Sequence, residues 1–212
     1  MKRFITIAGN IGAGKTTLAN LLSQKFKLTL HDEKFADNPY LTDFYTDMKR
    51  WSFHSQIFFL SQNFKAHLAI QQSSSSCLKD RSIYEDSEVF AANLHKRGLM
   101  SDRDYECYTD IYQTMLAALQ YPDLFIYLRA SVPTLCQRIR QRNRHFEKNI
   151  TPNYLRQINN GYEKFISRMQ NHTNVLIVQT DQFNIFEDNE KLEQIYHKIE
   201  TICFQQTHLV LD

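Results

Sequence analysis

Short apolar runs alternate with segments of helical periodicity along most of the chain. The short runs are typical of strands buried on both faces and are found at residues 3–8, 28–33, 77–80, 123–129 and 174–180. Between them, apolar residues recur with the 3.6-residue period of a helix at residues 15–26, 51–72, 84–97, 102–120, 132–145, 152–170 and 187–204. A turn at Pro39 followed by a short helix is predicted within residues 38–48.

This alternation predicts an α/β fold: a three-layer sandwich in which helices flank a five-stranded parallel sheet. With 212 residues, one domain over 1–212 is expected. Ligands of such sheets bind beyond the carboxyl ends of the strands. Glu33, Asp80, Arg81 and a glycine-rich loop all follow strands, so we expect the site there.

Composition narrows the class of protein. The formal net charge is only +2, which gives no electrostatic case for nucleic acid or a membrane surface as a partner. No apolar run reaches the about 18 residues that a membrane helix needs. The start, MKRFITIAGN, is interpreted as a first strand because its apolar part is too short for a signal peptide. Four scattered cysteines favour reduced thiols and a cytoplasmic location.

The segment GNIGAGKT fits the phosphate-loop pattern G-x-x-x-x-G-K-[ST], and it follows a predicted strand and opens a predicted helix. Its backbone N–H groups would surround a phosphate chain at the positive end of the helix dipole. Lys15 would reach the β- and γ-phosphates, and Thr16 would ligate Mg²⁺. The predicted ATP-binding residues of the loop are Gly9, Asn10, Ile11, Gly12, Ala13, Gly14, Lys15, Thr16 and Thr17.

Three outcomes for the phosphate compete: hydrolysis in a switch or motor, transfer to a small molecule, and binding alone. A guanine-recognition motif N/T-K-x-D is absent, and the run at 77–80 ends in Asp without the Asp-Glu of many mechanical ATPases. The segment 136–147 carries four arginines, at 138, 140, 142 and 144. They are either a solvated basic helix or a lid, at about 138–150, whose arginines stabilise the transferring phosphoryl group. The lid favours a kinase of nucleosides, nucleotides or similar metabolites.

A hydroxyl acceptor needs a carboxylate that takes its proton. Glu33, at the end of the second strand, is the best-placed candidate; the alternative is a simple ion pair with a basic residue. Asp80 ends the third strand beside the loop and could hold Mg²⁺ through water.

Several segments together resemble the deoxynucleoside kinase family, most of all its bacterial deoxyadenosine/deoxyguanosine kinase branch, over residues 1 to about 200. They are GNIGAGKTT, a strand-ending Glu shortly before NPYL, FYTDMKRWSFHSQ, DRSIYED, FIYLR and RIRQRNRHFE, in the family's order and spacing. The resemblance implies a Mg·ATP-dependent deoxynucleoside 5′-kinase of nucleotide salvage, commonly dimeric, with deoxyadenosine favoured and deoxyguanosine or deoxycytidine as further substrates.

The resemblance also implies roles for single residues. Glu33 matches the family's base, Arg81 the arginine at the 5′-oxygen and the transferred phosphate, and Asp80 an acidic residue near the metal that is sometimes assigned as the base. The residues that match family positions for substrate contacts are Tyr45 and Glu147 for the sugar 3′-hydroxyl, and Gln56, Asp86 and Phe90 for the base. Those that match donor-nucleotide positions are Arg138 over the adenine and Arg142 and Arg144 on the phosphates.

The base contacts agree with the chemistry of the side chains. Gln56 both donates and accepts hydrogen bonds, whereas ionised Asp86 only accepts, so a base with an amino or ring N–H donor fits and thymine does not. Relatives that use purines commonly carry an arginine seven residues after the glutamine, but this chain has Asn63 there. Asp86 is therefore expected to be held differently, through Lys65 or water. Glu85 and Glu88 are interpreted as surface residues.

Two rival functions stay open at this stage. A nucleoside monophosphate kinase of the thymidylate type shares the loop and the lid, but it needs basic residues for the acceptor phosphate, and the region of Glu33 offers only Lys34. A non-catalytic nucleotide-binding regulator does not need Lys15, Thr16, Glu33 and the arginines together. Apolar spacing within 105–119 fits either an intersubunit helix bundle or packing inside one subunit, and we expect a homodimer.

Overall fold

The five strands pair in the order β2–β3–β1–β4–β5, and every pairing is parallel. The computed structural model describes residues 2–32, 37–144, 147, 150–183, 185 and 188–204. The strands are β1 (Phe4–Gly9), β2 (Thr29–His31), β3 (Cys77–Asp80), β4 (Leu124–Arg129) and β5 (Asn174–Gln179). The predicted five-stranded parallel sheet is confirmed, and β1, which leads into the glycine loop, lies at its centre.

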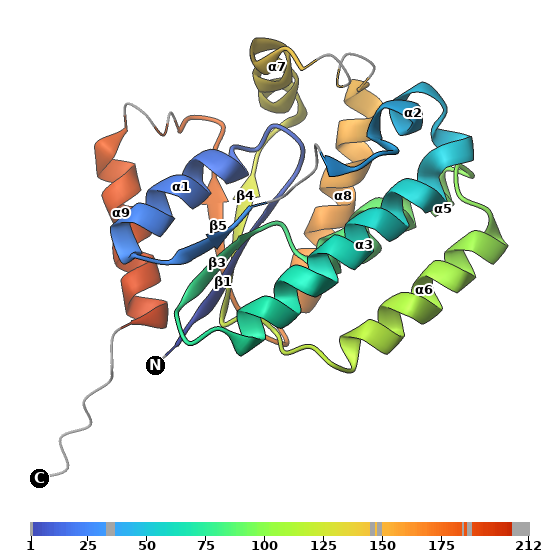
Figure 1. Cartoon of the computed structure of the whole chain (residues 1–212). Coiled ribbons are helices and arrows are strands. Elements are labelled where there is room, and N and C mark those ends of the chain that lie inside the picture. The colour runs from blue at the N-terminus through green and yellow to red at the C-terminus, as the bar shows by residue number, and fades with distance from the viewer. Residues whose placement is uncertain are drawn as a thin grey trace, which may run out of the picture.

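Helices cover both faces of this sheet (Figure 1). One face carries α1 (Lys15–Phe26) and α9 (Asn189–Cys203), and the other carries α3 (Met48–Gln72), α6 (Asp102–Leu116) and α8 (Pro152–Met169). The remaining helices are α2 (Leu41–Thr46), α4 (Ile83–Glu85), the π-helix η2 (Asp86–Ala91), α5 (Ala92–Lys96) and α7 (Val132–Arg142). The predicted three-layer arrangement is therefore confirmed, with α7 standing above the carboxyl ends of the strands.

The apolar core has two parts, one on each side of the sheet, because successive strand residues face opposite sides. In β4, Ile126 and Leu128 pack with Leu18 of α1 and Ile199 of α9. The intervening aromatic residue Tyr127 packs on the other side, in the cluster that includes residues of α3, α6 and α8. This two-sided burial explains why the strands are continuous apolar runs and not alternating ones.

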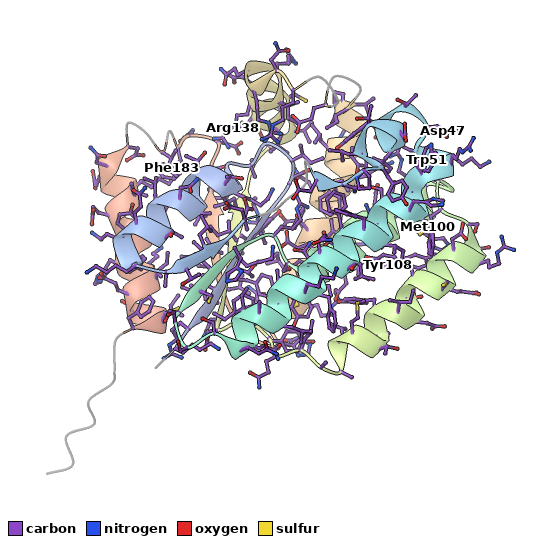
Figure 2. All side chains as sticks on the ribbon, in the orientation of Figure 1. Asp47, Trp51, Met100, Tyr108, Arg138 and Phe183 are labelled. Atoms are coloured by element: carbon purple, nitrogen blue, oxygen red, sulfur yellow. The ribbon has the colours of Figure 1, made fainter. Side chains whose placement is uncertain are left out.

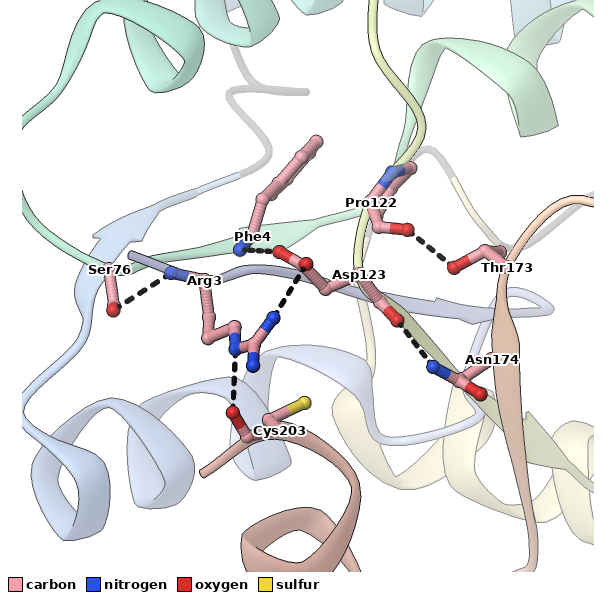
Figure 3. Close-up of polar contacts among 8 residues, drawn as sticks. All are labelled: Arg3, Phe4, Ser76, Pro122, Asp123, Thr173, Asn174 and Cys203. Atoms are coloured by element: carbon pink, nitrogen blue, oxygen red, sulfur yellow. Dashed lines mark hydrogen bonds and ion pairs between the residues drawn. The ribbon is translucent and has the colours of Figure 1, made fainter. Parts of the chain in front are cut away.

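Polar contacts tie the elements together at the end of the sheet opposite the site (Figure 3). The Asp123 carboxylate accepts hydrogen bonds from the Phe4 backbone N–H at 2.7 Å and from the Arg3 guanidinium at 3.2 Å. Arg3 also donates to the Cys203 carbonyl at 2.6 Å, and its backbone N–H donates to Ser76 Oγ at 3.0 Å. One charged pair thus joins the beginnings of β1 and β4 to the end of α9.

Helix starts follow from local chemistry. Ser101, Ser131 and Thr151 each cap a helix by accepting a hydrogen bond from a backbone N–H three residues on. The segment predicted as one helix at 84–97 differs, because residues 86–91 are π-helical between two short α-helical pieces. The wider π turn changes which side chains share a face, and such turns are frequent at functional sites. No helix within the described ranges has both the length and the apolar composition needed to span a bilayer.

Candidate functional site

Two clefts meet at the loop between β1 and α1. The first, of about 350 Å³, is lined by loop residues and by side chains from α2, α3, η2 and the segment after α7. The second, of about 790 Å³, lies between the loop, α7 and the segment that follows β5. Gly12, Gly14, Thr17 and Arg142 line both clefts. Two ligands bound in these clefts would therefore face each other across the phosphate loop.

The loop has the curled backbone that its sequence predicts. Gly12 and Gly14 have φ of +84° and +99°, a region that favours glycine. Lys15 is 7% exposed, and its ammonium donates to the carbonyls of Gly9 at 3.0 Å and Asn10 at 3.1 Å. The Asn10 amide donates to the Leu155 carbonyl at 2.9 Å, which fixes the loop to α8. Helix α1 begins at Lys15, so its first N–H groups point toward the enclosed space.

Thr16 and Asp80 lie next to each other, as expected from their places after β1 and β3. The Thr16 hydroxyl donates to Asp80 Oδ2 at 2.6 Å. Among the described residues, no group of three or more His, Cys, Asp or Glu side chains could hold a metal ion. A hydroxyl and one carboxylate fit Mg²⁺, which proteins usually hold through one or two carboxylates together with substrate phosphates and water.

Arg81 is positioned by an unusual backbone conformation. It follows the last residue of β3 with φ of +65°, and its backbone N–H donates to the Ile7 carbonyl at 3.1 Å. Its guanidinium carbon lies 4.3 Å from the centre of the Phe90 ring. Both side chains line the first cleft, so the predicted phosphate contact and the predicted base contact are brought together.

Gln56 and Asp86 line the first cleft, and both are at most 5% exposed. The Oε1 atom of Gln56 is buried and has no hydrogen-bond partner in the described part of the chain. Asn63 donates its amide N–H to Asp86 Oδ2 at 2.5 Å. The expectation that Lys65 or water would hold Asp86 did not include this contact. Asn63 of α3 is shorter than the arginine found at this position in relatives, yet its amide reaches the Asp86 carboxylate directly.

Arg142, the last residue of α7, lines both clefts, and the residues that follow it line the first. Glu147 is 5% exposed and forms a two-pronged ion pair with Arg142, at 2.5 and 3.1 Å. Arg144 lies 3.7 Å from the same carboxylate. All three line the first cleft together with Tyr45 of α2. The predicted lid of 138–150 is described here except for residues 145, 146, 148 and 149.

Arg138 lines the second cleft (Figure 2). Its guanidinium donates to the Thr180 carbonyl at 2.6 Å, to Thr180 Oγ1 at 3.1 Å and to the Phe183 carbonyl at 3.4 Å. It also donates to the Ala13 carbonyl of the phosphate loop at 3.2 Å. Arg138 therefore connects α7, the loop and the segment after β5 around the second cleft. Neither Thr180 nor Phe183 belongs to a motif recognisable in the sequence.

Two sequence predictions have different outcomes. Glu33, the predicted base, lies outside the described residues. Glu85 was interpreted as a surface residue, and this is wrong: its side chain is fully buried, at 0% exposure. Ser82 and Glu85 form a capping box, in which each side chain bonds the backbone N–H of the other residue. The S-x-x-E spacing of Ser82 and Glu85 was the sequence signal that could have identified this contact.

Several known proteins are similar to this chain in sequence or in structure. A family model described as deoxynucleoside kinase matches residues 5–204. The deoxyadenosine/deoxycytidine kinase of Bacillus subtilis (strain 168) is 35% identical over 200 residues, which cover 93% of this chain and 92% of that protein. The deoxyguanosine kinase of the same strain is 39% identical over 178 residues, 84% of either chain. A solved structure of deoxyadenosine kinase from M. mycoides with bound dATP has a TM-score of 0.82 at 27% identity, covering 93% of this chain and 99% of that one.

The contact between Gly12 and α7 provides a test of the loop. A Cβ atom at residue 12 would lie 3.0 Å from Ile139 Cγ1 and 3.2 Å from the Leu135 carbonyl, at a positive φ. Gly12→Ala should therefore push α7 away and weaken nucleotide binding by about 5–150-fold, if the whole overpacking cost of about 1–3 kcal/mol falls on the bound state. Gly98→Ala is the matched control, because its φ is +67° and nothing lies within 4 Å of the added Cβ. Calorimetric titration with ATP should give an unchanged affinity for this control; equal affinities for both variants would contradict the proposed contact.

Proposed function

The chain belongs to the deoxynucleoside kinase family, and from this premise we propose that it transfers the γ-phosphoryl group of Mg·ATP to the 5′-hydroxyl of a deoxynucleoside, with deoxyadenosine preferred. The observation that carries the proposal is the pair of clefts that share Gly12, Gly14, Thr17 and Arg142. The first would hold the acceptor and the second the donor nucleotide. The reaction would serve nucleotide salvage.

The acceptor base would bind at the deep end of the first cleft. There Gln56 Oε1 and the Asp86 carboxylate are both hydrogen-bond acceptors, and Phe90 offers a flat ring beside them. The amino group of adenine or cytosine has two N–H donors for these acceptors, while the Gln56 amide can donate to the neighbouring ring nitrogen. Deoxyguanosine stays among the possible substrates, because a similar protein of Bacillus subtilis is a deoxyguanosine kinase. Thymine would set a carbonyl oxygen against the Asp86 carboxylate.

The sugar and the phosphates would lie toward the loop. Tyr45 and Glu147 would bind the 3′-hydroxyl, and Arg81 would contact the 5′-oxygen and the phosphoryl group in transfer. Glu33 would accept the proton of the 5′-hydroxyl. Thr16 and Asp80 would hold Mg²⁺ with the donor phosphates, where the ion neutralises the phosphate charge.

The donor nucleotide would contact residues of the loop and of α7. Residues 9–17 would surround its phosphates, with Lys15 turning from the loop carbonyls toward the β- and γ-phosphates. Arg142 and Arg144 would exchange part of their contact with Glu147 for the phosphates. Arg138 would lie against the adenine, supported by its place in the second cleft.

We further propose that residues 1–212 form one kinase domain that works as a homodimer in the cytoplasm. Tyr108 and Tyr112 of α6 are buried within one subunit, so their spacing needs no partner. Phe58 and Phe64 of α3 and Ile111 of α6 keep part of their apolar surface exposed and would meet a second copy. Light scattering should give twice the mass of one chain; a monomer at micromolar concentration would contradict the dimer. The four cysteines are free thiols, in keeping with a reducing compartment.

A substrate panel tests the proposal. Wild-type protein and Asp86→Ala are incubated with Mg·ATP and each of the four deoxynucleosides, or each monophosphate, and the products are separated. Wild type should phosphorylate deoxyadenosine with the highest kcat/KM and should reject thymidine. Asp86→Ala should raise the thymidine-to-deoxyadenosine ratio of kcat/KM by at least about tenfold. The substitution removes the repulsion between the Asp86 carboxylate and the thymine carbonyl oxygen, which we expect to be worth about 1.4 kcal/mol or more.

The outcomes of the panel separate the rival functions. Phosphorylation of a monophosphate alone would indicate a nucleoside monophosphate kinase, and no phosphorylated product at all would indicate a regulator. An unchanged ratio in Asp86→Ala would remove Asp86 from base recognition while leaving the kinase assignment in place.

Glu33→Gln tests whether Glu33 is the general base of the reaction. The amide cannot accept the 5′-hydroxyl proton, so kcat should fall by about 10²–10⁴-fold, the range typical of a lost general base. The dissociation constant for deoxyadenosine should change by less than about threefold, because the shape of the side chain is kept. A near-normal kcat in steady-state assays would assign the base to another carboxylate, with Asp80 as the next candidate.

A further inference from the structure

Glu85 is a fully buried carboxyl group beneath the phosphate loop, and it does not line either cleft. Its Oε1 atom accepts from the Ser82 backbone N–H at 2.9 Å and from the Ser82 hydroxyl at 3.1 Å. Its Oε2 atom lies 2.7 Å from the Tyr162 hydroxyl of α8 and 3.4 Å from the Gly9 backbone N–H. Glu85 therefore connects the residue that follows Arg81 with the first glycine of the loop.

Proton counting assigns a charge state to this cluster. The Tyr162 hydroxyl carries one proton, yet it lies 2.7 Å from Glu85 Oε2 and 2.8 Å from the Gly9 carbonyl oxygen. Both short contacts contain a proton only if Glu85 carries one: Glu85 then donates to Tyr162, and Tyr162 donates to Gly9. Burial also raises the pKa of Glu85, although Arg81, Tyr162 and Lys15 act in the opposite direction.

The cluster also reaches the guanidinium of Arg81. Nη1 of Arg81 donates to the Tyr162 hydroxyl at 3.5 Å. Arg81 is thus constrained twice: at its backbone through Ser82, which follows it, and at its side chain through Tyr162. The Gly9 carbonyl that accepts the hydrogen bond of Tyr162 also accepts one from the Lys15 ammonium, at 3.0 Å.

We propose that Glu85 is a positioning residue for phosphoryl transfer, acting as a neutral acid that fixes Arg81 relative to Gly9 and Lys15 through Ser82 and Tyr162. It touches neither substrate. Glu85 would hold two side-chain cations at a fixed separation around the transferring phosphoryl group. They are Lys15, which follows β1, and Arg81, which follows β3. A displacement of about 1 Å at such a group can cost about 10²-fold in rate.

Glu88 of η2, three residues after Glu85, provides a matched control. It is a carboxylate of the same helical segment, but it accepts from the Tyr112 hydroxyl of α6 at 2.8 Å and pairs with Arg168 of α8. Neither partner lines a cleft. Glu88→Gln changes the same functional group only three residues away, without touching the loop or Arg81.

The experiment compares kcat and KM of Glu85→Ala, Glu85→Gln, Tyr162→Phe and Glu88→Gln with those of the wild type, with circular dichroism as a check of folding. Glu85→Ala should lower kcat by about 10–100-fold with KM for deoxyadenosine within about threefold, because Arg81 acts mainly on the transition state. Glu85→Gln should stay within about fivefold of the wild type, since its amide N–H donates to Tyr162 as the acid would. Tyr162→Phe should fall about tenfold in kcat, and Glu88→Gln should match the wild type.

Each outcome decides the proposal. A folded Glu85→Ala with kcat within about twofold of the wild type would overturn the positioning role, and a folded Glu85→Gln as slow as Glu85→Ala would overturn the neutral acid. If Glu85→Ala does not fold, Tyr162→Phe with the kcat of the wild type overturns the link. The proposal rests on the kinase function proposed above. Failure of that function is distinguishable, because the wild type itself would then phosphorylate no deoxynucleoside.

Discussion

Arg81 leaves β3 in a left-handed backbone conformation, and the arrangement of the site depends on this turn. A residue with a Cβ atom in this region costs about 1–2 kcal/mol, which must be offset by its surroundings. The offset is visible on both sides of the residue. The Arg81 N–H continues the sheet pairing to the Ile7 carbonyl, and the capping box of Ser82 and Glu85 starts the next helix at once. As a result, the guanidinium enters the cleft beside Phe90 instead of following the direction of the strand.

The turn also sends the side chains of Asp80 and Arg81 to different partners. Asp80 stays in the sheet and meets Thr16, whereas Arg81 is directed into the first cleft. Lys15, Arg81 and Arg142, which come from three different parts of the fold, all line the first cleft, and Arg142 also lines the second. Their charges favour an anion at this point, and the glycines leave room for it close to the backbone. A phosphate chain bound in the second cleft would end where the first cleft begins.

The sequence was sufficient for the strands, for most helices and for many of the residues that line the clefts, but not for Thr180 or Phe183. Hydrophobic periodicity and the phosphate-loop motif predict these features, because the features depend on the spacing of residues that are close together in the sequence. Contacts between distant elements were harder to predict. Asn63 and Asp86 are 23 residues apart on different helical elements, and Glu85 and Tyr162 are 77 residues apart. Their hydrogen bonds depend on how α3, η2 and α8 pack, which residue types and spacing do not encode separately.

The π-helical segment is the clearest case of this limit. Residues 83–96 have the composition of an ordinary helix, and the extra residue in the turn arises where η2 packs against α3 and α8. That turn sets Asp86 and Phe90 toward the cleft while Glu85 points beneath the loop and Glu88 toward α6. The stretch of charge that looked solvent-exposed in the sequence is therefore divided between the first cleft, a buried cluster and an ion pair.

Phosphorus-31 NMR of the product tests the central claim most directly, because the claim is that the two clefts align the γ-phosphate with one particular hydroxyl. With Mg·ATP and deoxyadenosine, the proton-coupled phosphorus signal of the new monophosphate should be a triplet, since a 5′-phosphate is attached to a CH₂ group. A doublet would mean that the 3′-hydroxyl was phosphorylated, and inorganic phosphate alone would mean that ATP was hydrolysed. Either result would contradict the arrangement of clefts proposed for this protein.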